Sequence, residues 1–193
     1  FNCLDRHVEA GNGDRVAIHW VGEPGDTRDL TYSQLLAEVS KAANALTGLG
    51  LVAGDRVAIY MPMVPEAIVA MLACARIGAV HSVVFGGFAA NELAARIDDA
   101  QPVALLTASG GLEPGRAVEY LPMVAKAIEL AQSKPTTVIV KDRGQIAGSA
   151  ADHAGWIDWD AAIADAAPVA PTPVAATDPL YILYTSGTTG KPK

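Results

Sequence analysis

A segment near the end of the sequence, residues 185–193, combines the residue types that hold phosphate groups. It reads Thr-Ser-Gly-Thr-Thr-Gly-Lys-Pro-Lys and follows the apolar run of residues 180–184. Glycines let a backbone approach an anion closely, and successive N–H groups can form an anion-binding nest to which hydroxyls and a lysine add donors. The residues expected to contact phosphate are Thr185, Ser186, Gly187, Thr188, Thr189, Gly190 and Lys191. The alternative is a plain polar turn after a strand.

Two well-known phosphate-binding patterns do not fit this segment. A Walker loop needs four residues between its glycines and a Ser or Thr after its lysine. Here only two residues separate Gly187 from Gly190, and Pro192 follows Lys191. Proline has no N–H and therefore removes a donor. The dinucleotide pattern G-x-G-x-x-G also fails, because no third glycine precedes Gly187.

The elements that must position this loop alternate along the chain. Continuous Val/Ile/Leu runs indicate strands that are buried on both sides. The expected strands are 15–22, 56–61, 81–85, 103–109, 136–141 and 180–184, and the expected helices are 31–50, 65–78, 91–100, 120–132 and a short one within 156–167. This alternation predicts an α/β fold with a largely parallel sheet and helices on both faces.

Helix boundaries have clear local signals. Thr31 can cap the first long helix, with Gln34 as its capping-box partner and Gly50 as its end. Pro65 suits the first position of the next helix, which is expected to reach Gly78. These signals support the helical assignments.

Parallel α/β sheets bind ligands beyond the carboxyl ends of their strands. The loops at that edge are 62–66, 85–88, 109–116 and 185–193. Residues 165–178 are rich in Pro and Ala and are interpreted as a surface connection.

Composition limits the possible partners and setting. The net charge of −7 argues against nucleic acid and anionic membranes as partners. The most apolar stretch, residues 64–84, carries Glu66, Arg76 and His81 and does not read as a membrane span. Cys3 and Cys74 have no metal-binding spacing, so no metal site is expected within the chain. Cys74 is interpreted as a buried free thiol in a reduced, cytoplasmic setting.

Residues 184–193, YTSGTTGKPK, resemble the phosphate loop of the adenylate-forming (AMP-binding) superfamily. That superfamily includes acyl-CoA synthetases, peptide-synthetase adenylation domains and luciferases. Residues 30–62 are similar to a stretch early in its large domain, and 66–109 look like its short-chain acyl-CoA synthetase branch. Residues 109–120, SGGLEPGRAVEY, resemble the propionyl-CoA synthetase loop more than the acetyl version, which tends to carry an arginine near Glu113. The resemblance covers essentially the whole chain.

The resemblance implies an ATP-dependent ligase that joins a small carboxylate to coenzyme A through an acyl-adenylate. ATP, Mg²⁺ and coenzyme A would be its cofactors and cosubstrates. Thr185 to Lys191 would hold ATP and pyrophosphate, with Lys191 assisting a main catalytic lysine outside the chain. Gly86, Gly87 and Arg116 would contact coenzyme A.

The same resemblance implies that residues 1–193 form the N-terminal portion of the large adenylation domain, without the C-terminal small domain. These residues alone are not expected to catalyse. Propionate is the expected acid. The alternatives are an acetyl-CoA synthetase or another adenylate-forming ligase, a non-catalytic nucleotide- or CoA-binding α/β module, and a folded remnant without its own function.

Overall fold

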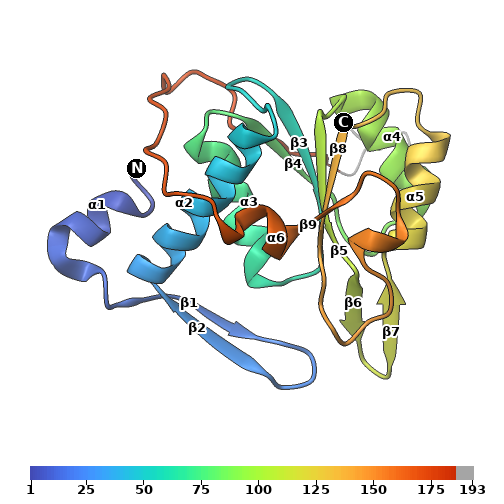
Figure 1. The fold of residues 1–193 in the computed structure, drawn as a ribbon, viewed down its shortest axis with the longest axis horizontal. Coiled ribbons are helices and arrows are strands. Elements are labelled where there is room, and N and C mark those ends of the chain that lie inside the picture. The colour runs from blue at the N-terminus through green and yellow to red at the C-terminus, as the bar shows by residue number, and fades with distance from the viewer. Residues whose placement is uncertain (186–193) are drawn as a thin grey trace.

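A parallel six-stranded sheet runs through the middle of the molecule (Figure 1), whose computed structural model describes residues 1–185. Neighbouring strands in this sheet all run in the same direction. In spatial order the strands are β10 (Tyr181–Ile182), β4 (Val80–Val83), β3 (Arg56–Tyr60), β5 (Ala104–Ala108), β8 (Thr137–Lys141) and β9 (Ile157–Asp158). The predicted parallel α/β architecture is confirmed.

Helices cover both faces of this sheet, as Figure 1 shows. One face carries α2 (Tyr32–Gly48), α3 (Pro65–Arg76) and α6 (Trp159–Ala164), and the other carries α4 (Ala90–Ala100) and α5 (Leu121–Leu130). Shorter turns are α1 (Asp5–His7), a π-helical turn (Val8–Asn12) and a 3₁₀ turn (Ala150–Asp152). In the described part of the chain, no helix is long and apolar enough to cross a membrane.

The predicted helix starts are confirmed. Thr31 Oγ1 accepts from the Gln34 N–H at 3.2 Å, and Gln34 Oε1 accepts from the Thr31 N–H at 2.9 Å. Pro65 is the first residue of α3, where its missing N–H costs nothing. The first long helix stops at Gly48, two residues before Gly50, which takes a positive φ of 94°.

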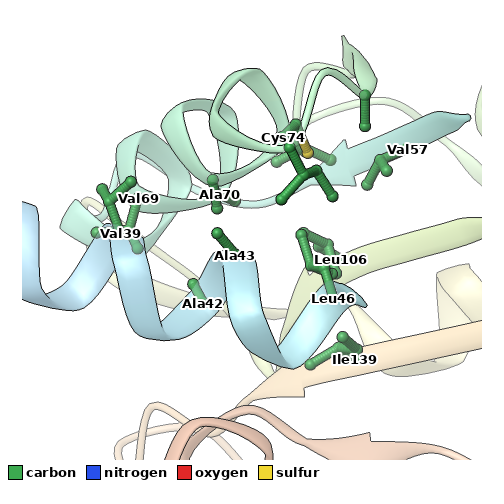
Figure 2. Packing of buried hydrophobic residues seen from close by; sticks show 14 of the residues in the cluster. Val39, Ala42, Ala43, Leu46, Val57, Val69, Ala70, Cys74, Leu106 and Ile139 are labelled. Atoms are coloured by element: carbon green, nitrogen blue, oxygen red, sulfur yellow. The ribbon is translucent and has the colours of Figure 1, made fainter. Parts of the chain in front are cut away.

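Two hydrophobic clusters lie on opposite faces of the sheet. Figure 2 shows one of them, in which Val39 and Leu46 of α2 pack near Val69 of α3 and Leu106 of β5. Leu105, the neighbour of Leu106 in β5, belongs to the cluster under α4 and α5. This alternation follows from the two-residue period of a strand. Cys74 is buried in the first cluster, and burial raises the pKa of its thiol to about 12.

The strand expected at 15–22 does not join the main sheet. It is β1 (Val16–Val21), which pairs antiparallel with β2 (Thr27–Thr31), a strand the sequence reading missed. The turn between them closes where Gly22 N–H donates to Asp26 O at 2.7 Å. Arg28 of β2 binds Glu38 of α2 and Glu66 of α3, so the hairpin is fixed to two helices.

The short helix expected within 156–167 is present as α6, and strand β9 precedes it. Two other expectations need correction. The expected loop 109–116 is largely a hairpin of β6 (Gly110–Glu113) and β7 (Arg116–Glu119), whose tip holds Gly115 at a positive φ of 76°. The strand expected at 180–184 is limited to β10.

The Pro/Ala-rich connection between α6 and β10 contains no helix or strand. It is nevertheless fixed to the core helices, because Val169 O accepts hydrogen bonds from Ser40 Oγ at 3.2 Å and Arg76 Nε at 2.6 Å. This path carries the chain across one face of the sheet to the opposite edge.

Candidate functional site

The strand order creates a point where the chain changes direction within the sheet. From β3 the chain first passes to β4 on one side, and then returns to β5 on the other side of β3. Loops leaving neighbouring strands in opposite directions open a crevice at their carboxyl ends, where α/β sheets bind ligands. Here those loops begin at Met61 after β3 and at Ser109 after β5.

A cavity of about 850 Å³ lies at this point. Its volume is within the range of small-molecule sites. Its lining includes the aromatic side chains of Trp20, Phe85, Phe88, Tyr120 and Tyr184. Its charged lining residues are Glu23, Glu92, Arg96, Glu113 and Arg143. The cavity therefore combines flat apolar surfaces with a few charges, as a ligand with a ring and ionised groups requires.

Gly86 and Gly87 both line this cavity, as part of the loop after β4. A Cβ on Gly86 would lie 2.3 Å from Tyr120 Oη, and one on Gly87 would lie 2.4 Å from the Phe85 ring. Tyr60 Oη lies 3.1 Å from Gly86 O and 2.8 Å from Phe88 O, and so supports the loop from inside the core. Packing against Tyr120 and Phe85 thus requires glycine at both positions, and both positions also form part of the cavity wall.

Arg116 lies on β7 and is not part of the cavity lining. Its side chain is 70% exposed, and its Nε and Nη2 donate to Glu113 Oε2 at 2.8 Å and 2.6 Å. Glu113 does line the cavity. The structure therefore places the predicted CoA-binding arginine outside the cavity, next to one of its acidic residues.

The start of the predicted phosphate loop reaches the same cavity. Thr185 and Tyr184 line it, and Tyr184 Oη donates to Asp99 Oδ2 at 2.6 Å. Burial and the neighbouring Asp99 raise the pKa of the Tyr184 hydroxyl. The Arg96 guanidinium lies 4.3 Å from the Phe88 ring centroid and 5.4 Å from that of Tyr184. Ser186, Gly187, Thr188, Thr189, Gly190 and Lys191 lie outside the described residues.

Several cavity residues were not predicted from the sequence, among them Arg143, Arg96 and Trp20. Arg143 follows strand β8, so the carboxyl-edge rule could have indicated it. Arg96 lies inside a predicted helix, and nothing in the local sequence indicated that it would line a cavity. Trp20 comes from the unexpected hairpin, and its Nε1–H donates to Met63 O at 2.7 Å. That bond holds the hairpin against the loop after β3.

No metal centre is built by the described residues. Between residues 1 and 185, no group of three or more His, Cys, Asp or Glu side chains lies close enough to hold a metal ion. His81 is not a cavity residue; it lies in β4 beside the Tyr181 ring, and burial lowers the pKa of its imidazole.

Residues 4–193 match the sequence profile of the AMP-binding enzyme family. The chain belongs to this family, which confirms the resemblance seen in residues 184–193.

Among the curated relatives, acetyl-coenzyme A synthetase of Streptomyces avermitilis is 54% identical over 194 residues, covering 100% of this chain and 29% of that protein. The mitochondrial acyl-CoA synthetase short-chain family member 3 of Bos taurus is 48% identical, again over 100% of this chain and 28% of that protein. The chain thus spans less than a third of the length of these relatives. The solved structure of acetoacetyl-CoA synthetase from Streptomyces lividans has a TM-score of 0.86 at 29% identity, over 98% of this chain and 28% of that one.

Proposed function

We propose that this chain is part of an AMP-forming acid–thiol ligase that acts on a short-chain carboxylate. One structural observation carries the proposal: the loop 85–88 and Thr185 meet in one cavity at the carboxyl edge of the sheet. The family membership and the synthetases among its relatives support the same class.

The reaction has two steps. A carboxylate oxygen attacks the α-phosphorus of ATP and forms a new P–O bond, while the P–O bond to the β-phosphate breaks. Pyrophosphate departs, and the acyl-adenylate is the product. The thiol sulfur of coenzyme A then attacks the acyl carbonyl, and AMP leaves as the thiol proton is lost. Donors around the departing pyrophosphate stabilise charge as it develops. We assign that role to Thr185 through Gly190, with Lys191 assisting.

Gly86, Gly87 and Arg116 are proposed to contact coenzyme A. The two glycines bring backbone into the cavity wall, where a bound ligand can approach it closely. Arg116 would act from outside the cavity, where its exposed side chain already pairs with Glu113. Mg²⁺ would accompany ATP and neutralise part of the charge on its phosphates.

We place residues 1–193 in the N-terminal portion of the large domain of such a ligase, with the main catalytic lysine beyond them. The whole chain aligns with less than a third of the length of each of these relatives, which supports this placement. A reducing, cytoplasmic setting is proposed on the basis of Cys3 and Cys74, both of which are free thiols.

Propionate is the proposed acid, because residues 109–120 resemble the propionyl-CoA synthetase loop. We expect pyrophosphate exchange into ATP, measured on the full-length protein, to be more efficient with propionate than with acetate. One methylene in an apolar pocket discriminates by about 10-fold or more. A preference for acetate would favour the acetyl-CoA synthetase alternative, which the names of several relatives support.

Two controls distinguish a ligase from a non-catalytic binding module. Residues 1–193 alone should give no exchange, since the main catalytic lysine is proposed to lie outside them. Absence of exchange by the full-length protein with every short acid tested would exclude the ligase. Binding of coenzyme A without exchange would then indicate the non-catalytic module.

A further inference from the structure

Of the three arginines in and beside the cavity, two form ion pairs with carboxylates of the described residues and one does not. Arg96 Nη1 donates to Glu92 Oε2 at 2.9 Å, and Arg116 pairs with Glu113 at 2.6 Å. Arg143 also lines the cavity, but no carboxylate of the described residues lies within ion-pair distance of its guanidinium. A half-buried guanidinium without a counter-charge favours an anion from outside.

The backbone around Arg143 is fixed. Its N–H donates to Oγ of the buried Ser109 at 3.1 Å, at the end of neighbouring strand β5. The adjacent carboxylate of Asp142 is turned toward the Gly144 N–H, from which it accepts at 2.7 Å. The Arg143 guanidinium has one long contact, 3.4 Å from Nη1 to Gly110 O. Most of its donors therefore remain available.

Arg143 also acts on the ring that faces the glycine loop. Burial raises the pKa of Tyr120, the Glu113 charge raises it further, and the Arg143 charge lowers it. Tyr120 Oη in turn lies beside Gly86, close enough to exclude any Cβ there. The guanidinium, the phenol and the glycine loop thus belong to one part of the cavity wall.

We propose that Arg143 binds a phosphate of the nucleotide end of coenzyme A within this cavity. Coenzyme A carries an adenine ring, a 3′-phosphate and a pyrophosphate, which match the aromatic walls and the unpaired guanidinium. The proposal rests on the acyl-CoA ligase function proposed above. Arg143 would thus be a second arginine that binds coenzyme A, inside the cavity, whereas Arg116 lies outside it.

Calorimetric titration of the full-length protein with coenzyme A tests this assignment. Arg143→Met is expected to raise the dissociation constant for coenzyme A by about 10-fold or more, the usual loss for a charge-assisted hydrogen bond. Pantetheine has no phosphate, so its affinity should not change. Arg143→Lys should restore part of the affinity, since it keeps the charge but loses the planar fork.

Arg15→Met, at an exposed arginine outside the cavity, is the matched control and should leave coenzyme A binding unchanged. Unchanged coenzyme A affinity in Arg143→Met would overturn the assignment. So would an equal loss for pantetheine, which would indicate a structural role, or a loss confined to ATP. Because binding is measured without turnover, failure of the ligase proposal shows separately as absent pyrophosphate exchange.

Discussion

At the scale of single residues, one buried ion pair connects the first turn of the chain to the core. Arg76 Nη1 and Nη2 donate to the Asp5 carboxylate at 2.8 Å and 2.9 Å, and both side chains are largely buried. Arg76 also donates to Val169 O from the Pro/Ala-rich connection. Three segments distant in sequence therefore depend on one guanidinium.

Asp5→Asn should lower the free energy of unfolding by about 3 kcal/mol, because it leaves the arginine buried without its counter-charge. The bond with Arg76 holds the pKa of Asp5 below its ordinary value of 3.8. The stabilisation is therefore complete above that value and is lost as the pH falls below it. Urea unfolding at a series of pH values measures both effects.

The control for this experiment is Asp14→Asn, at an exposed carboxylate. Its effect should stay within about 0.5 kcal/mol. A difference between wild type and Asp5→Asn that stayed constant down to acid pH would contradict the ionic origin of the stabilisation.

At the scale of elements, the two hairpins contain strands that the sequence pattern does not predict. Strand β2 reads Thr-Arg-Asp-Leu-Thr, and β6 begins with two glycines, so neither has the apolar run that identifies a buried strand. Their pairing depends on turns and on contacts from other elements, such as Arg28 with Glu66. These contacts are formed by residues far apart in the chain and leave no local pattern.

The segment just after the short strand β10 is linked to α4 by the hydrogen bond from Tyr184 to Asp99. Tyr184→Phe removes the hydrogen bond to Asp99 but keeps the ring beside Arg96. We expect a loss of about 1 kcal/mol and faster hydrogen exchange at residues 181–184, with α4 unaffected. Hydrogen exchange followed by mass spectrometry measures this.

Tyr32→Phe is the matched control for that variant. Its ring contacts His7, and its hydroxyl makes no hydrogen bond within residues 1–185. Exchange at residues 181–184 should not change in this control. Equal exchange in wild type and Tyr184→Phe would show that Asp99 does not secure the strand.

At the scale of the whole molecule, the two hydrophobic clusters share one sheet. Leu106 packs on the α2 and α3 side, and Leu105 packs on the α4 and α5 side. Trp159 lies in the first cluster and Trp156 packs against the second. Because β3, β5 and β8 each contribute side chains to both clusters, loss of packing on one face of the sheet should also destabilise the other face.

Leu105→Ala and Leu106→Ala should each lower the free energy of unfolding by about 2–5 kcal/mol, as expected for fully buried leucines. Each should shift one common transition, seen alike by circular dichroism and tryptophan fluorescence. Two separate transitions in either variant would show instead that the faces unfold independently.

The sequence by itself determined the parallel α/β sheet, the helix starts at Thr31 and Pro65, and the family. These depend on local periodicity, capping residues and a contiguous motif, all of which are short-range properties of the chain. The tertiary structure decided which side chains share the cavity. Arg116 and Arg143 are both basic residues near the carboxyl edge, yet the β6–β7 hairpin holds Arg116 outside the cavity, where it pairs with Glu113. Arg143 lines the cavity because β8 pairs with β5 and brings its end beside Ser109, a long-range contact that no local pattern encodes.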